Sequence, residues 1–144
     1  MTIHLDHFIV SARDKIAAGR LLAKLLGVSC GEAQAGPFFA VYINVGLTLD
    51  FFETDEAFPV EHFCFRVGDD EFDAILDRIK AAGIKYRSAV RGPEDMQIST
   101  QFGGRGVYWN EPEGHQWEML TVSYARQAPV GHSDTKQVDQ HEFE

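Results

Sequence analysis

The stretch DHFIV at residues 6–10 reappears as EHFCF at residues 61–65, and this repetition decides the fold. Each copy is followed by an amphipathic stretch that ends in an apolar-Gly-apolar step, LGV around Gly27 and AGI around Gly83. Within each copy the spacing of apolar residues changes from two to about 3.6, which indicates a strand followed by a helix. The sequence therefore contains two copies of one structural unit.

Further strands are predicted after each helix. Short segments rich in Val, Ile, Tyr and Phe are separated there by Gly, Pro and Asn, as strands and turns require. The segments are FFAVYINV (38–45) and LTLDFFE (47–53) in the first half, and KYRSAV (85–90), GVYWN (106–110) and HQWEMLTV (115–122) in the second. We therefore predict an α+β fold of two βαβββ modules, at about 3–55 and 60–124, within one domain spanning 1–126.

Size and charge exclude several classes of protein. A chain of 144 residues supports one hydrophobic core. Its formal net charge of −9 disfavours nucleic acid as a partner. Since no apolar run is long enough to span a bilayer and the N-terminus lacks signal-peptide features, we expect no membrane contact and a cytoplasmic location. Residues 127–144 have few apolar side chains, and we expect a flexible polar tail there.

Strand alternation places four polar residues on faces turned away from the helices: His7, Asp50, His62 and Glu118. A single histidine in such a place is more often a hydrogen-bonded structural residue than a ligand. Here a histidine and a carboxylate occur at equivalent places in both halves, which favours one shared site. Imidazole and carboxylate groups suit one divalent metal ion such as Fe, Mn, Co, Ni or Zn.

The second half carries a resemblance to a known family. The stretch GGRGVYWNEPEGHQWEMLT (103–121), together with EHFCFRV and LDHFIV, resembles the vicinal oxygen chelate superfamily. That superfamily includes glyoxalase I, methylmalonyl-CoA epimerase, fosfomycin-resistance thiol transferases, extradiol dioxygenases and bleomycin-resistance proteins. The resemblance covers roughly residues 3–124. It implies curved mixed sheets around a metal-holding cavity and a homodimer, with the site built within one chain or across two.

The resemblance also implies roles for individual residues. His7, His62 and Glu118 match the metal ligands, and Asp50 stands where glyoxalase-like members have a fourth ligand, commonly Glu. Because the side chain of Asp50 is one methylene shorter, it is expected either to coordinate directly or to hold a metal-bound water. The leading hypothesis is a lyase or isomerase that acts on a small substrate with vicinal oxygens, with Asp50 or Glu118 as the base that moves the proton.

Other functions remain open at this stage. An Fe(II) extradiol-type dioxygenase would use His7, His62 and Glu118 as a 2-His-1-carboxylate set. A thiol transferase and a metal-free ligand-binding resistance protein are further alternatives. The segment 91–104 is interpreted as a flap over the cavity. The residues expected in the substrate pocket are Phe52, Cys64, Arg66, Arg105 and Tyr108.

Overall fold

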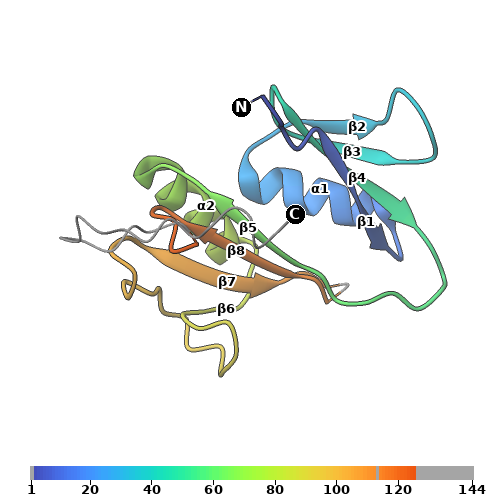
Figure 1. Ribbon diagram of the computed structural model, residues 1–144. Helices are drawn as coiled ribbons and strands as arrows, with labels where there is room; N and C mark the ends of the chain where they lie inside the picture. Colours follow the sequence, from blue (N-terminus) through green and yellow to red (C-terminus); the bar gives the residue numbers. More distant parts are fainter. Residues whose placement is uncertain (1, 113, 126–144) are drawn as a thin grey trace, which may run out of the picture.

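The computed structural model describes residues 2–112 and 114–125, and within them each half of the chain forms one sheet and one helix (Figure 1). The predicted tail from residue 127 onward lies outside the described residues. The first half contains β1 (His7–Ala12), α1 (Lys15–Leu26), β2 (Cys30–Glu32), β3 (Phe39–Asn44) and β4 (Leu47–Glu53). The second half contains β5 (His62–Arg66), α2 (Asp69–Ala81), β6 (Tyr86–Arg87), β7 (Gly106–Asn110) and β8 (Gln116–Leu120).

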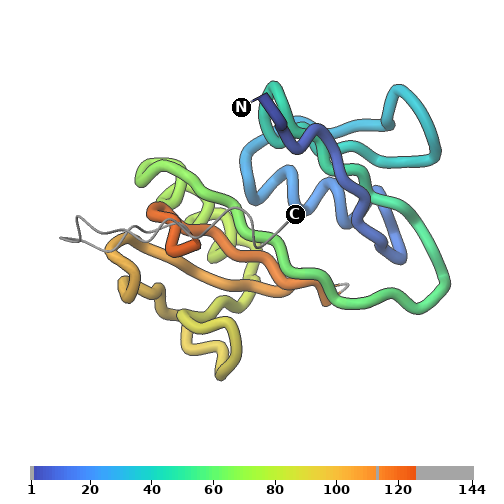
Figure 2. The backbone as a smooth tube through the Cα atoms, in the orientation of Figure 1, coloured from blue at the N-terminus to red at the C-terminus, as the bar shows by residue number. Residues whose placement is uncertain are grey.

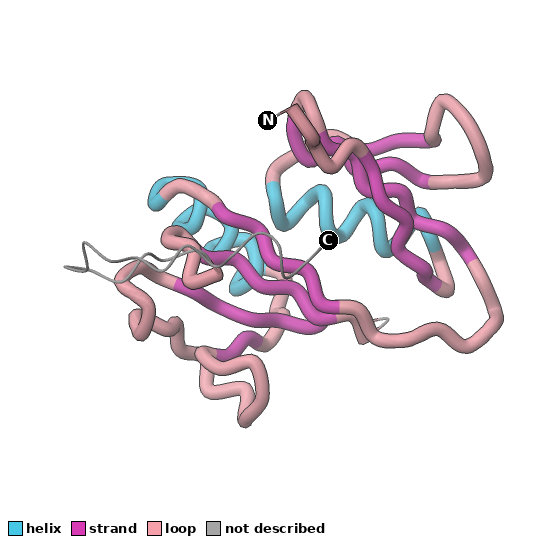
Figure 3. The backbone as a smooth tube through the Cα atoms, viewed as in Figure 1, coloured by secondary structure: helices cyan, strands magenta, loops and turns pink. Residues whose placement is uncertain are grey.

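The two sheets have the same topology. Their strand orders are β1-β4-β3-β2 and β5-β8-β7-β6, so in each sheet the first strand lies beside the last. That pair is parallel in both sheets, and the remaining pairs are antiparallel. The predicted α+β fold of two βαβββ units is confirmed. The sixth strand is shorter than predicted, because only Tyr86 and Arg87 of KYRSAV pair with β7 and the chain then enters a long loop (Figure 3).

Both helices begin and end at residues suited to those positions. The Asp14 carboxylate accepts a hydrogen bond from the Ala17 backbone N–H at 2.9 Å and so caps α1. Gly27 ends this helix in the left-handed conformation with φ 73°, which a residue without a Cβ adopts at little cost. The first turn of α2 carries acidic side chains, whose negative charges interact favourably with the helix dipole. Neither helix within the described residues is long and apolar enough to cross a membrane.

The helix-facing sides of the two sheets share one hydrophobic core. Buried side chains of β1 and β4, such as Val10 and Phe51, belong to the same cluster as Trp109 and Trp117 of the second sheet. Helix α1 lies on the side of the first sheet that faces the second half (Figure 2). The rings of Phe8 and Phe63 are 5.1 Å apart and join the two first strands. As a result, the opposite faces of both sheets, which carry the polar residues, turn away from the common core.

His115 connects the two halves through its hydrogen bond to Ser11 and also binds the chain just before β5. It is 1% exposed, its Nε2–H donates to the Ser11 carbonyl at 2.7 Å, and its Nδ1 accepts from the Glu61 backbone N–H at 3.0 Å. The Phe58 ring stacks on it at 5.3 Å. This histidine is a structural residue at the junction of the sheets, and it is not one of the four predicted ligands.

Candidate functional site

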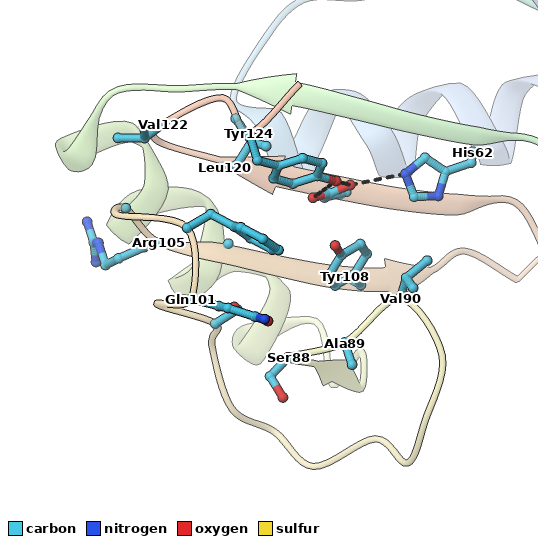
Figure 4. Close-up of a pocket in the computed structure, with 15 residues that line it drawn as sticks. His62, Ser88, Ala89, Val90, Gln101, Arg105, Tyr108, Leu120, Val122 and Tyr124 are labelled. Carbon is cyan, nitrogen blue, oxygen red and sulfur yellow. Dashed lines mark hydrogen bonds and ion pairs between the residues drawn. The ribbon is translucent and has the colours of Figure 1, made fainter. Parts of the chain in front are cut away.

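His62 and Glu118 meet on the outer face of the second sheet. They lie on the paired strands β5 and β8, in which Cys64 is opposite Glu118 and His62 is opposite Gln116. The side chains reach each other diagonally, and His62 Nε2 lies 3.1 Å from Glu118 Oε1 (Figure 4). Strand parity predicted that both residues share this face, and the neighbouring positions of β5 and β8 bring them into contact.

The orientation of the His62 ring is fixed by Gln116. The Gln116 side-chain oxygen accepts a hydrogen bond from His62 Nδ1, and the Gln116 amide donates to the Val90 carbonyl at 2.7 Å. This arrangement directs Nε2 toward Glu118. Metal-binding histidines commonly donate the N–H of one ring nitrogen to an oxygen acceptor, as Nδ1 does here, and bind the metal through the other nitrogen.

Glu118 is a deeply buried carboxylate. It is 1% exposed, and its side chain contacts His62 and the hydroxyl of Tyr124. Cys64 and Tyr108 also hydrogen bond with it. The Tyr124 O–H is 2.9 Å from Oε1 and 2.8 Å from Oε2. Desolvation raises the pKa of Tyr124, so the phenol stays protonated and acts as a donor.

A cavity of about 410 Å³ lies beside this pair. Its walls come from β7, β8 and the loops that follow β6 and β8 (Figure 4). Apolar and aromatic side chains provide much of the lining, among them Val90, Phe102, Tyr108, Leu120 and Val122. The volume suits a small organic molecule, and the His62–Glu118 pair supplies polar groups at one wall.

Tyr108 is a predicted pocket residue that the structure does place in this wall. Its ring centroid is 6.2 Å from that of His62. Burial raises the pKa of the Tyr108 phenol, which therefore remains a hydrogen-bond donor at neutral pH. The segment 91–104, interpreted as a flap, borders the same cavity through Ser99, Gln101, Phe102 and Gly104.

His7 and Asp50 lie in a different hollow, on the first sheet. This hollow of about 390 Å³ is lined by both residues and by parts of β3 and the loop before it. The His7 ring is exposed, and its Nδ1 is 2.7 Å from Asp6 Oδ2. The hydrogen bond with Asp6 raises the pKa of His7, and the negative charge of Asp50 adds to this effect.

One chain therefore does not assemble the predicted set of four ligands. Within residues 2–112 and 114–125, no group of three or more His, Cys, Asp and Glu side chains is close enough to hold a metal ion. The sequence left open whether the site lies within one chain or across two, and the described part of a single chain does not bring the two halves of the site together. The helix-facing sides of the sheets pack together, so the two faces that carry the ligands point away from their common core.

The other predicted pocket residues lie around the cavity or apart from it. Cys64 and Arg66 line a neighbouring hollow of about 400 Å³. Desolvation, and then the charge of Glu118, raises the pKa of the Cys64 thiol to about 12. Phe52 lies on the first sheet, where its ring is 6.0 Å from that of Phe38.

Arg105 borders the cavity, but its guanidinium points away from it (Figure 4). The guanidinium binds Asp73 at 2.5 Å and Asp69 at 3.1 Å, and it lies 4.5 Å from the centre of the Phe72 ring. These contacts raise the pKa of Arg105, with the hydrogen bond to Asp73 as the largest cause. Arg105 therefore fastens the loop before β7 to the first turns of α2 instead of reaching a substrate.

The sequence analysis missed Gln116 and Tyr124. Strand parity could have identified Gln116, since it lies on the same face as Glu118 and directly opposite His62. Tyr124 follows the last strand, in a stretch without periodicity, and no pattern in the sequence indicated that it returns to Glu118.

Comparisons with known proteins identify the family. Two solved structures, named Oxidase ChaP-H2 and Oxidase ChaP-H1, share 41% and 38% sequence identity with this chain, with TM-scores of 0.78 and 0.79. The alignments cover 86% and 87% of this chain and 97% and 100% of theirs. No protein-family model matches the chain, and no curated protein matches it.

More distant structures share the fold. The fosfomycin resistance protein FosX from Mesorhizobium loti has 18% identity and a TM-score of 0.64, covering 87% of this chain and 97% of its own. Lactoylglutathione lyase from Agrobacterium tumefaciens has 18% identity and a TM-score of 0.62, covering 84% and 94%. The chain belongs to the vicinal oxygen chelate superfamily, as its sequence motifs predicted.

Proposed function

We propose that two copies of this chain form a homodimer in which His62 and Glu118 of one copy and His7 of the partner subunit hold one divalent metal ion. The support is chemical and geometric. His62 and Glu118 provide one imidazole nitrogen and one carboxylate oxygen 3.1 Å apart, which is part of a ligand set that borderline divalent ions accept. His7 lies on an open sheet face, where a second copy can approach it.

The first sheet has the surface that such a dimer requires. Register places Ile9 opposite Asp50, on the same face as His7, and Tyr42 opposite Thr48. On this face Ile9 is 55%, Tyr42 37% and Phe52 38% exposed. Large apolar side chains gathered on an open face favour burial against a partner. A two-fold arrangement would make two equivalent sites, each with ligands from both chains.

Asp50 would lie at the edge of this centre. It lines the same hollow as His7, and its negative charge adds to the raised pKa of that histidine. In the dimer, Asp50 would either coordinate the ion or hold a water molecule bound to it, since its side chain is short.

We infer that the reaction is an O2-dependent oxidation of a small substrate with neighbouring oxygen atoms. The observation that carries this inference is the identity of 41% and 38% to two proteins named oxidases, over almost their whole length. A 2-His-1-carboxylate set with open positions is typical of non-haem Fe(II) centres, and bound Fe(II) would supply positions for substrate and O2. The sequence alone favoured a lyase or isomerase over an Fe(II) dioxygenase, and the proposal made here favours the O2-dependent reaction instead.

The residues of the chain have clear tasks in such a reaction. Gln116 orients His62, and Glu118 supplies the carboxylate ligand. The apolar wall formed by Phe102, Leu120 and their neighbours excludes water from the substrate. The protonated phenol of Tyr108 faces the same cavity and is placed to donate a hydrogen bond to a substrate oxygen.

A metal-dependent lyase or isomerase is the second candidate. It is favoured by Asp50, a carboxylate that lines the same hollow as His7 and would be placed to move a proton in the dimer. In this function the metal would stabilise an enediolate of the substrate, and no oxygen would be consumed.

Oxygen uptake separates the two candidates. The protein is loaded with Fe(II) without air, a panel of catechols is added, and O2 consumption is followed with an electrode. We expect consumption by the wild type and none above background by His62→Ala. Turnover of a vicinal-oxygen substrate without O2 consumption would favour the lyase or isomerase. Equal activity of the His62→Ala variant would refute the proposed centre.

A further inference from the structure

Tyr124 makes the most direct contact with Glu118 outside the strands. It belongs to the loop that follows β8, four residues after the strand ends at Leu120. Its hydroxyl lies 2.9 Å from one carboxylate oxygen and 2.8 Å from the other, so a single O–H donor is shared between both acceptors (Figure 4). A donor in this position restricts rotation of the carboxylate about its last bond.

The need for such a donor follows from the burial of Glu118. With 1% of its surface exposed, the carboxylate has little contact with water. The carboxylate also lies 3.1 Å from His62 Nε2. If that nitrogen binds a metal ion, it is no longer available for a hydrogen bond with Glu118. The hydroxyl of Tyr124 still reaches both carboxylate oxygens, beside the Tyr108 hydroxyl and the Cys64 thiol, which also hydrogen bond with Glu118.

The ring of Tyr124 is itself held in place. Its centroid is 4.8 Å from that of Phe102, which belongs to the segment interpreted as a flap. Tyr124 also lines both the cavity beside His62 and the neighbouring hollow that contains Cys64. The ring therefore forms a wall between the two hollows and connects the flap segment to the carboxylate.

We propose that Tyr124 is a positioning residue, which holds Glu118 in the orientation that presents one oxygen to a metal ion shared with His62. The inference rests on the proposed function, because it concerns the same centre. Outer hydrogen bonds to a ligand commonly change metal affinity by about 10- to 100-fold, and we expect a loss in this range when the hydroxyl is removed.

The test is a titration of the metal-free dimer with Mn²⁺ or Co²⁺, followed by calorimetry. The variant is Tyr124→Phe, which removes the hydroxyl and keeps the ring against Phe102. The matched control is Tyr86→Phe, a hydroxyl removed from a core residue of β6 that lines neither hollow. We expect Tyr124→Phe to bind the ion about 10- to 100-fold more weakly, with a melting temperature close to that of the control.

A second readout separates positioning from a general structural role. The visible spectrum of bound Co²⁺ reports the geometry of its ligands, and we expect it to change in Tyr124→Phe and to stay unchanged in Tyr86→Phe. Affinity and spectrum equal to those of the wild type, or tighter binding by Tyr124→Phe, would overturn the inference alone. Absence of metal binding by the wild type, or undiminished binding by His62→Ala, would overturn the proposed function and this inference together.

Discussion

His115→Leu should weaken the junction between the two halves of the chain without touching the proposed ligands. The substitution keeps a side chain of similar size but removes both ring nitrogens. The Ser11 carbonyl and the Glu61 backbone N–H, at 2.7 Å and 3.0 Å in the wild type, would each lose a partner. Both bonds are partly buried. The stacking of the ring on Phe58 would also be lost.

The expected cost follows from these two bonds. A buried polar group left without a partner costs about 1–3 kcal/mol, and partial burial places each group near the lower end, so we expect about 2–3 kcal/mol in total. For a domain of this size that loss lowers the melting temperature by roughly 5–10 °C. The free energy of unfolding is measured by urea denaturation at fixed protein concentration, because a dimer gains stability with concentration.

The control for this prediction is His4→Leu. His4 lies in the exposed stretch before β1, so its replacement should change the free energy of unfolding by less than about 0.5 kcal/mol. If His115→Leu costs no more than His4→Leu, the hydrogen bonds of His115 do not hold the two halves together. Other contacts of the common core would then hold the two halves together.

Three further outcomes are expected. Arg105→Ala should lower the free energy of unfolding by about 1 kcal/mol and leave the affinity for Mn²⁺ unchanged, since its guanidinium binds Asp69 and Asp73 of α2. A weaker metal affinity in calorimetry would contradict this role. The Ser88 hydroxyl lowers the pKa of Asp95, so the stabilisation by this carboxylate is present above its unfolded pKa of 3.8 and is lost as the pH falls through the lower folded pKa. The difference in unfolding free energy between wild type and Asp95→Asn should therefore shrink below pH 3.8, and a difference that grows on acidification would refute the assignment. The pKa of the Cys64 thiol is about 12, against an ordinary 9.0. In the metal-free protein at pH 8, the fraction of Cys64 present as thiolate should therefore be about a thousandth of the usual one. Mass spectrometry after alkylation should show that Cys64 is labelled much more slowly than Cys30. Equal labelling rates for the two cysteines would show that the pKa of the Cys64 thiol is not raised.

The fold was predictable because it depends on local periodicity. The repeat at His7 and His62 fixed the start of each module, and the change of apolar spacing separated strands from helices. Parity along β5 and β8 also placed His62 and Glu118 on one face correctly. These inferences use only neighbouring positions in the chain, which is why they hold in the structure.

The arrangement of the two sheets was not predictable in the same way. Parity states which face a side chain occupies, but it does not state whether two faces oppose each other in one chain or turn apart. The burial of Trp109 and Trp117 against the first half decided that question, and it separated His7 from His62. The contact of Tyr124 with Glu118 and the contact of Arg105 with Asp73 were not predictable for a related reason. Both residues lie in irregular segments, where strand parity does not state the direction of a side chain.

The most direct test of the account is a dimer assembled from two different variants. His7→Ala and His62→Ala chains with different tags are expressed together, and the mixed dimer is purified through both tags. In that dimer, His62 and Glu118 of the first chain would still meet the intact His7 of the other. Metal analysis should then find about one ion per mixed dimer, against two for the wild type and none for either variant alone. A mixed dimer without metal, beside a wild type that binds it, would contradict a centre built from both chains.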